Sequence, residues 1–232
     1  MTLIKSRSVT INIHGNSKTI KITRGCQQGG VLSPFLWNLV VDSLLNYTKN
    51  KIPCDMQAFA DDIALLATLE TPSNDGKGGP DADIIRDTTQ RSLTAINEWC
   101  KDSGLKISEL KTHSVMFTWK RKWKFSSPLK IDDHIIEMKK STKLLGIHID
   151  SKLSWNTHIE KQCKKAKGIL MQCRKAVGPT WGFTPKTMKW IYTAIVRPSL
   201  SYGAVIWING LNSNKNINQL SRVQRLANIL IT

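Results

Sequence analysis

The sequence has 232 residues, a hydrophobic fraction of 41% and a formal net charge of +17 at pH 7. A chain of this length can bury a substantial core, and it suits one large domain or two small ones. No apolar run reaches the roughly 20 residues of a membrane-spanning helix, and the N-terminus lacks a secretory signal, so an intracellular protein without a membrane partner is expected. The five cysteines are widely spaced and include no Cys-x-x-Cys pair, which argues against a zinc site.

The positive charge is concentrated in the second half of the chain. Residues 1–100 hold ten basic and ten acidic residues, whereas residues 101–200 hold twenty-one basic and seven acidic residues. Residues 201–232 add three more positive charges. This asymmetry predicts that the second half binds a polyanion, and it favours nucleic acid over a merely soluble basic surface or an anionic membrane.

The front of the chain reads as a β-hairpin, a loop and a helix. Residues 9–22 alternate between apolar and polar side chains on either side of a turn, which predicts the hairpin. A glycine-rich loop follows at residues 24–30, and Ser33-Pro34 predicts the start of a buried helix over residues 35–50. The loop is either a flexible connection or a backbone that approaches a flat or phosphate-bearing ligand.

Residues 57–66 place two adjacent carboxylates, Asp61 and Asp62, between two apolar runs of strand length. The pattern predicts a tight hairpin with both acids at its tip. Asp-Asp is a poor hairpin turn, because favoured turns need positive φ and because like charges repel. The pair therefore indicates either a binding site for a hard divalent cation or a plain polar turn.

The rest of the pattern is mixed up to residue 150 and mostly helical after it, with a boundary expected at residues 150–154. Further helices are predicted over residues 82–103, 156–177, 185–196 and 216–231, with Gly104 capping the first and Pro198 kinking or restarting the third. Extended segments are predicted over residues 112–119 and 142–149, with a small hairpin over 129–138 about Asp132-Asp133.

Four blocks in this order resemble those of reverse transcriptases. Residues 25–34, Gly-Cys-Gln-Gln-Gly-Gly-Val-Leu-Ser-Pro, resemble the motif in which Pro-Gln-Gly precedes Leu-Ser-Pro. Residues 59–62, Phe-Ala-Asp-Asp, resemble the catalytic F/Y-x-D-D box. Residues 104–112 resemble the G-L-x-x-N-x-x-K-T block, and residues 144–147, Leu-Leu-Gly-Ile, resemble the primer grip.

Two further segments make the resemblance closest to the reverse transcriptases of arthropod non-LTR (LINE-type) retrotransposons. These are residues 36–42 and the stretch from Lys175 to Trp207, which includes Tyr202-Gly203. The resemblance covers nearly the whole chain and implies an α+β fold. It implies a partial right-hand polymerase palm, with an antiparallel sheet and packed helices, over residues 1–150 and a mostly helical thumb over residues 151–232.

The resemblance implies an RNA-directed DNA polymerase with a two-metal mechanism. Two Mg²⁺ (or Mn²⁺) ions would activate the primer 3′-hydroxyl and stabilise the leaving pyrophosphate. Asp61 and Asp62 are the expected catalytic residues and metal ligands. Lys111 is expected to neutralise or protonate the pyrophosphate, the alternative being one more solvated lysine. Gln28 and Gly29 are expected to pack against the template strand or the incoming dNTP.

The second half is expected to hold the RNA template and the DNA primer. Leu145 and Gly146 would support the primer, the alternative being ordinary strand core. A basic helix face would track the backbone of the RNA–DNA hybrid with salt-sensitive affinity; its residues are Lys161, Lys164, Lys165 and Arg174. Four tryptophans are expected to be mostly core, with stacking on bases as the alternative: Trp119, Trp123, Trp181 and Trp190.

In the family a third catalytic carboxylate lies upstream of the glycine-rich loop, and this chain begins about one hairpin before that loop. The chain alone is therefore expected to show little or no synthesis, and the fingers and endonuclease of a larger polyprotein are expected outside it. The alternative functions are a catalytically dead nucleic-acid-binding remnant and an unstable fossil. A retrotransposon protein is expected in the nucleus and the cytoplasm.

Overall fold

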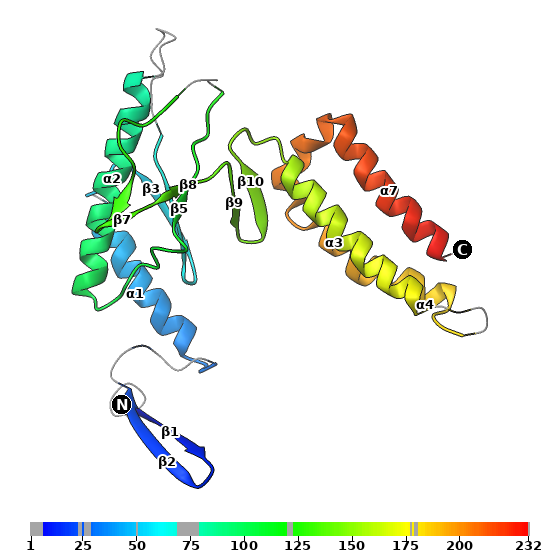
Figure 1. Cartoon of the computed structure of the whole chain (residues 1–232), viewed down its shortest axis with the longest axis horizontal. Helices are drawn as coiled ribbons and strands as arrows, with labels where there is room; N and C mark the ends of the chain where they lie inside the picture. Colours follow the sequence, from blue (N-terminus) through cyan, green and yellow to red (C-terminus); the bar gives the residue numbers. More distant parts are fainter. Residues whose placement is uncertain are drawn as a thin grey trace. The chain divides into compact units, whose positions relative to one another are not determined.

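The computed structural model describes residues 7–22, 25, 29–49, 51–68, 79–119, 123–176, 178 and 181–231. It divides into two compact units: unit 1 is Met1–Glu109 with Lys122–Ile135, and unit 2 is Leu110–Arg121 with Ile136–Thr232 (Figure 1). Helices and strands are mixed, as the predicted α+β class requires. This division differs from the boundary expected near residue 150, and the division into palm and thumb stays a prediction.

Unit 1 begins with the predicted hairpin, formed by β1 (Arg7–Ile13) and β2 (Asn16–Ile22). The strands pair antiparallel from Arg7 opposite Ile22 to Ile13 opposite Asn16, which leaves a two-residue turn. Both turn residues, His14 and Gly15, have positive φ, as the favoured hairpin turns require.

Two helices supply most of the buried core of unit 1. Helix α1 (Ser33–Thr48) begins at N-cap Leu32, one residue before the expected cap, with proline in its first turn. Helix α2 (Gly79–Asp102) follows the hairpin that carries Asp61. The core cluster joins one side chain of α1 to three of α2: Leu44, Ile96, Trp99 and Cys100. The prediction that α1 is well buried is wrong for the middle of the helix, since Leu39 and Val40 are exposed.

Helix α2 ends at the predicted glycine. Gly104 has φ +69°, its N–H donates to Lys101 O, and the N–H of Leu105 donates to Cys100 O. This pair of bonds is the Schellman arrangement, which satisfies carbonyls that the helix end would leave unpaired.

A small hairpin of β6 (Lys130–Ile131) and β7 (His134–Ile135) turns at Asp132-Asp133, as predicted. The Lys101 ammonium of α2 lies 2.6 Å from Oδ1 of Asp132, and Asn97 donates to the same oxygen. The Lys101 hydrogen bond lowers the pKa of the Asp132 carboxyl. Asp132 therefore links this hairpin to α2 through an ion pair and a hydrogen bond.

The strands of unit 2 are shorter than the sequence suggests. The expected strand over 112–119 is reduced to β5 (His113–Ser114), which pairs parallel with the two residues of β8 (Glu137–Met138). The expected single strand over 142–149 is instead a hairpin of β9 (Ser141–Leu144) and β10 (Ile147–Asp150). Leu145 and Gly146 form its turn, both at positive φ.

The rest of unit 2 is helical. Its elements are α3 (Asn156–Lys175), α4 (Pro185–Ile191), the π-helix η1 (Tyr192–Val196), α5 (Arg197–Ser201), α6 (Ala204–Trp207), the 3₁₀-helix η2 (Ile208–Asn212) and α7 (Asn214–Ile231). Thr184 caps α4, as predicted, by accepting from the Thr187 N–H at 3.2 Å. The π-helix directly precedes the turn with Pro198, which lacks an N–H for the regular ladder.

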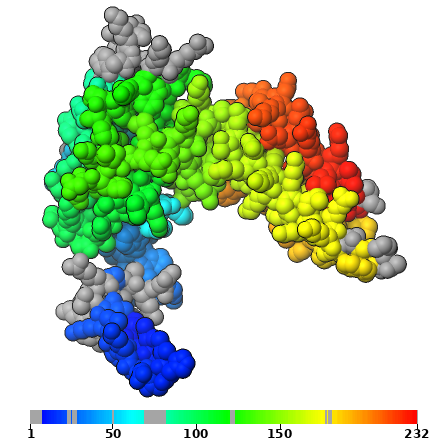
Figure 2. Space-filling view, viewed as in Figure 1, coloured from blue at the N-terminus to red at the C-terminus, as the bar shows by residue number. Residues whose placement is uncertain are grey.

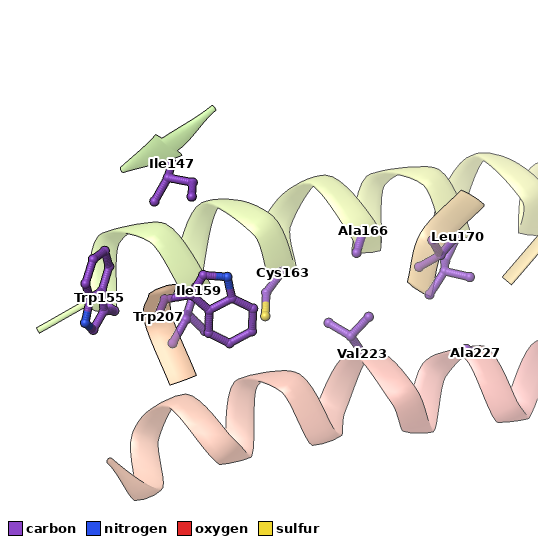
Figure 3. Packing of buried hydrophobic residues seen from close by; sticks show 10 residues of the cluster. Ile147, Trp155, Ile159, Cys163, Ala166, Leu170, Trp207, Val223 and Ala227 are labelled. Carbon is purple, nitrogen blue, oxygen red and sulfur yellow. The ribbon is translucent and has the colours of Figure 1, made fainter. Parts of the chain in front are cut away.

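The core of unit 2 lies between α3 and α7, which run side by side (Figure 1). One face of α3 points toward Val223 and Ala227 of α7, as Figure 3 shows, and it carries Ile159, Cys163, Ala166 and Leu170. Leu170 and Ala166 are fully buried. In the space-filling view the surface of α7, in red, lies against the yellow-green to yellow surface of α3 (Figure 2).

The entry into α3 is fixed by one carboxylate. Oδ1 of Asp150 accepts from the backbone N–H groups of Lys152 and Ser154, and Oδ2 accepts from the Trp155 N–H and the Ser154 hydroxyl. The chain needs this support because Leu153 and Trp155 both have positive φ, which L-residues rarely adopt.

Candidate functional site

The two acids lie on the hairpin of β3 (Asp55–Phe59) and β4 (Asp62–Leu66). Phe59 pairs with Asp62, so the two-residue turn consists of Ala60 and Asp61. The hairpin was predicted, but the turn lies one residue earlier than expected, and Asp62 is the first residue of β4. The register shift separates the two acids between turn and strand, and it places the positive φ, +52°, on Ala60.

A tryptophan of α1 holds this turn. The indole Nε1–H of Trp37 donates to the carbonyl oxygen of Ala60 at 2.6 Å. An alanine at positive φ is disfavoured by about 1 kcal/mol or more, so an outside hydrogen bond helps to keep the turn in this conformation. The sequence reasoning missed this role of Trp37, although the residue belongs to the segment that carries the family resemblance.

Both carboxylates are available to a ligand. Asp61 and Asp62 are exposed, and they offer oxygen donors, which Mg²⁺ prefers. Within the part of the chain that the structure describes, no three His, Cys, Asp or Glu side chains gather as a metal site. Two adjacent carboxylates nevertheless fit Mg²⁺, since this ion commonly uses one or two carboxylates and takes its other ligands from water and substrate phosphates.

The other residues expected at the catalytic centre are distributed as follows. Gln28 lies outside the described residues. Gly29 is exposed and lies ahead of α1 in unit 1. Lys111 is exposed and belongs to unit 2, where its carbonyl oxygen lies 2.9 Å from Nδ1 of His113. The structure thus joins Asp61 and Asp62 on one hairpin, and the role of Lys111 beside them stays a prediction.

Leu145 and Gly146, the residues expected to support the primer, form the turn between β9 and β10 rather than the interior of a strand. Leu145 is 43% exposed, so its side chain is not strand core. The hydroxyl of Tyr202 donates to the Leu145 carbonyl oxygen at 2.9 Å. The turn is therefore a surface feature held by a residue from the helical part of the same unit.

The expected basic face lies on α3, opposite its buried face. Its exposed residues are Lys161, Lys164, Lys165 and Arg174. Helix α7 adds three exposed basic residues, Lys215, Arg222 and Arg225. Residues 161–232 contain no Asp or Glu, so no carboxylate of that segment offsets these charges. The two packed helices consequently present positive charge suited to a phosphate backbone.

The tryptophans expected to be mostly core divide between surface and interior. Trp119 is 82% exposed, and Trp181 and Trp190 are each 63% exposed. Trp123 is half-buried and packs edge-on against Phe125, with ring centroids 5.7 Å apart. The expectation that these side chains belong to the core is wrong for Trp119, Trp181 and Trp190, whose exposed rings can stack on a flat ligand.

A buried histidine lies in the core of unit 2. Nδ1 of His158 accepts from the backbone N–H of His148 at 3.2 Å, and its ring lies 5.7 Å from that of Trp207. Burial, followed by the nearby His148 ring, lowers the pKa of His158. The neutral ring therefore belongs to the folded core of this unit.

Comparison with known proteins identifies the family. The family model described as reverse transcriptase (RNA-dependent DNA polymerase) matches residues 2–149. The chain belongs to the reverse transcriptase family. This match includes the Asp61 hairpin, Lys111 and the Leu145–Gly146 turn, and it ends before α3.

The resemblance to non-LTR retrotransposon reverse transcriptases is also confirmed. The chain is 23% identical over 225 residues to a putative 115 kDa protein in the type-1 retrotransposable element R1DM of Drosophila melanogaster, covering 97% of the chain and 21% of that protein. It is 24% identical over 234 residues to a probable RNA-directed DNA polymerase from transposon BS of the same organism, covering 99% of the chain and 24% of that protein. The chain thus spans about a quarter or less of the length of these relatives.

A third relative is a Pol polyprotein from a type-1 retrotransposable element R1 of Nasonia vitripennis, 23% identical over 88% of the chain and 58% of that protein. No solved structure matches the chain. None of the helices within the described residues has the length and apolar character needed to cross a membrane.

Proposed function

We propose that this segment carries out RNA-directed DNA synthesis as part of a larger retrotransposon polyprotein. The observation that carries the proposal is the exposed Asp61-Asp62 pair on a hairpin whose turn is held by Trp37. Family membership and the polymerase and polyprotein names of the relatives support it. Residues 1–150 act as a partial palm and residues 151–232 as a thumb, working in the nucleus and the cytoplasm.

Asp61 and Asp62 hold the divalent cations of a two-metal reaction. Bound Mg²⁺ or Mn²⁺ supplies activation of the primer 3′-hydroxyl and charge neutralisation at the leaving pyrophosphate. The protein contributes two carboxylates at a fixed turn, and the phosphates of the dNTP complete the ligand set. Lys111 donates a charge-assisted hydrogen bond to the pyrophosphate. Gln28 and Gly29 pack against the template strand or the incoming dNTP.

The basic face of α3 tracks the backbone of the RNA–DNA hybrid. Its lysines and Arg174 are exposed, and the following residues hold no acid that would repel phosphate. Each neutralised phosphate releases counterions, so the logarithm of the affinity falls by roughly 0.7 to 0.9 per phosphate contact for each tenfold rise in salt. Leu145 and Gly146 support the primer terminus.

The experiment on the metal site uses the 232-residue chain and does not require synthesis. Mn²⁺, added with an RNA–DNA hybrid and a dNTP, is expected to broaden the NMR signals of residues 59–63. Asp61→Asn is expected to abolish the broadening. Asp133→Asn, which alters an exposed acid in the turn of the β6–β7 hairpin of unit 1, is expected to leave the broadening intact. Equal broadening in wild type and Asp61→Asn contradicts the proposed ligand.

Primer extension on a homopolymer RNA template with Mg²⁺ tests the chemistry. For the chain alone we expect little or no synthesis, because the resemblance assigns three catalytic carboxylates and this chain matches two of them. In the longer polyprotein Asp61→Asn is expected to reduce synthesis by more than about 100-fold, since loss of groups that merely support metal ligands already costs about 10- to 100-fold. Robust primer extension by the Asp61→Asn variant contradicts the proposed role of Asp61 as a catalytic metal ligand.

A nucleic-acid-binding protein without catalysis is the second candidate, favoured by the acid-free segment 161–232. Filter binding to an RNA–DNA hybrid at rising salt, combined with primer extension by the longer polyprotein, separates the two functions. Salt-sensitive binding together with synthesis by the longer polyprotein supports the polymerase. Binding without synthesis in that polyprotein supports the remnant, and an affinity indifferent to salt contradicts the phosphate-tracking face in both.

A further inference from the structure

The Tyr202-Gly203 corner, which follows α5, packs against the Leu145–Gly146 turn of the same unit. The Tyr202 hydroxyl donates to the carbonyl oxygen of Leu145 at 2.9 Å, across 57 positions of sequence. Leu145 has φ +46°, a conformation that L-residues rarely adopt. A turn of this kind needs support from outside the hairpin, and the tyrosine supplies it.

Two glycines make the contact close. A Cβ on Gly146 would lie 3.1 Å from Cε1 of Tyr202, and a Cβ on Gly203 would lie 2.6 Å from Cδ1 of Ile147. Both glycines also have positive φ, +87° and +64°. The Tyr202 ring therefore packs on the backbone of Gly146, and the Ile147 side chain packs on the backbone of Gly203.

The corner itself is anchored in the core of unit 2. The indole Nε1–H of Trp207 donates to the carbonyl oxygen of Tyr202 at 2.9 Å. Trp207 is buried in the cluster that also holds Ile159 of α3. The turn and the tyrosine side chain nevertheless remain accessible, since Tyr202 is 52% exposed. A ligand can thus reach a turn whose position is set by the helical core.

We propose that Tyr202 is a positioning residue for primer binding: it holds the Leu145–Gly146 turn in the conformation that supports the primer terminus. This inference rests on the proposed function, because the primer is the ligand of the turn. Tyr202 also couples the turn to the helical part of unit 2. It is hydrogen-bonded to Trp207, which is buried in the same core as α3.

The experiment uses Tyr202→Phe, which removes the hydroxyl and keeps the ring. Tyr192→Phe is the matched control, because Tyr192 packs on the core of the same unit, whereas the hydrogen bond to the Leu145 carbonyl comes from Tyr202. The first readout is the hydrogen exchange of the Gly146 and Ile147 amides in the 232-residue chain. Tyr202→Phe is expected to speed this exchange about five-fold, the size of one neutral hydrogen bond, with exchange in α3 unchanged.

The second readout is affinity for an RNA–DNA hybrid with a recessed DNA 3′ end, compared with a blunt hybrid of the same length. Tyr202→Phe is expected to weaken binding of the recessed hybrid about five-fold and to leave binding of the blunt hybrid unchanged. A purely structural role would weaken both equally.

The two readouts separate the possible failures. Unchanged amide exchange in Tyr202→Phe overturns the positioning role, whatever the hybrid affinity does. Faster exchange with equal loss for both hybrids overturns the primer-positioning role, since the variant then acts through general structure. Faster exchange with no loss for either hybrid also overturns it, and shows that the turn is held by Tyr202 but does not contact a primer. That last result contradicts the primer contact within the proposed function, while the metal site of Asp61 is tested separately by Mn²⁺.

Discussion

The Ala60–Asp61 turn of unit 1 and the Leu145–Gly146 turn of unit 2 share one device. Each begins with a non-glycine residue at positive φ, and in each an aromatic side chain donates a hydrogen bond to the carbonyl of that residue. The surroundings differ. At the Leu145–Gly146 turn, Gly146 and Gly203 allow close packing of side chains against the backbone. Near the Ala60–Asp61 turn, the side chains of Phe59 and Ile63 are exposed.

The difference indicates two ways to hold an exposed turn in a rarely adopted backbone conformation. The Leu145–Gly146 turn is connected through Tyr202 and Trp207 to a large buried cluster, so its position follows that core. The Ala60–Asp61 turn is held by the Trp37 hydrogen bond and by its own strand pairing, with its carboxylates open to solvent. Open surroundings suit the proposed role of the Ala60–Asp61 turn, because the remaining ligands of a bound Mg²⁺ would come from water and the substrate.

The largest expected effect comes from a cavity in the core of unit 2, which should loosen the Leu145–Gly146 turn and not the Ala60–Asp61 turn. Leu170→Ala is expected to destabilise unit 2 by about 2 to 5 kcal/mol, because Leu170 is fully buried and a cavity replaces it. Hydrogen exchange is then expected to rise at the Leu145–Gly146 turn and to stay unchanged at Ala60–Asp61. Met171→Ala is the control, since Met171 is exposed. Equal acceleration at both turns would break the comparison.

The second effect is a pH dependence confined to unit 2. Well above the ordinary histidine pKa of about 6.5, His158 is neutral in both the folded and unfolded states, so its contribution to the stability of unit 2 is full. Below that value the unfolded chain takes up a proton that buried His158 resists, and the free energy of unfolding falls by at most about 1.4 kcal/mol per pH unit until the lowered folded pKa is reached. The pKa of His148 is lowered too, which acts in the same direction.

Urea unfolding of unit 2 at about pH 7.5 and about pH 5 measures this dependence. His158→Asn keeps an acceptor for the His148 N–H without titrating, so it is expected to flatten the profile. His14→Asn, at an exposed turn of unit 1, is expected to leave the profile unchanged. An unaltered profile in His158→Asn would show that another group controls it.

The smallest effect concerns the hydrogen bond that holds the Ala60–Asp61 turn. Trp37→Phe removes the donor and is expected to loosen that turn by about 0.5 to 1.5 kcal/mol. The affinity for Mn²⁺, measured by titration with hybrid and dNTP present, is expected to fall about 2- to 10-fold. Trp190→Phe changes an exposed indole of unit 2 and is the control. Unchanged Mn²⁺ affinity would mean that the strand pairing alone sets the turn.

Local patterns predicted those parts of the fold that depend on near neighbours. Alternation predicted the hairpin of β1 and β2, helical periodicity predicted α3 and α7, and Gly104 marked the end of α2. The hairpin with Asp61 was also predicted, with an error of one residue in its turn. Here the placement of positive φ on Ala60 rather than on an acid was not visible in the sequence, because alanine is not a residue that such turns favour.

The parts that could not be predicted depend on distant partners. Leu145 was placed inside a strand because leucine seldom occupies a turn at positive φ, and the residue that supports it, Tyr202, lies 57 positions away. The strand expected over residues 112–119 is reduced to the two residues that pair with β8, a partner that lies more than twenty positions further along the chain. For the candidate site, the acids and the basic face of α3 were located from the sequence, whereas Trp37 was not given its role, since an indole bond to a backbone carbonyl leaves no motif.

The absence of Asp and Glu after Glu160 also determines how unit 2 responds to its solvent. Twelve basic side chains in residues 161–232 repel one another without a carboxylate of that segment to offset them. Multivalent anions that accumulate there lower this repulsion, so polyphosphate should raise the melting temperature of unit 2 more than sodium chloride does at equal ionic strength. If the proposed binding holds, we expect a polyanion to act as a ligand that stabilises the folded helical unit.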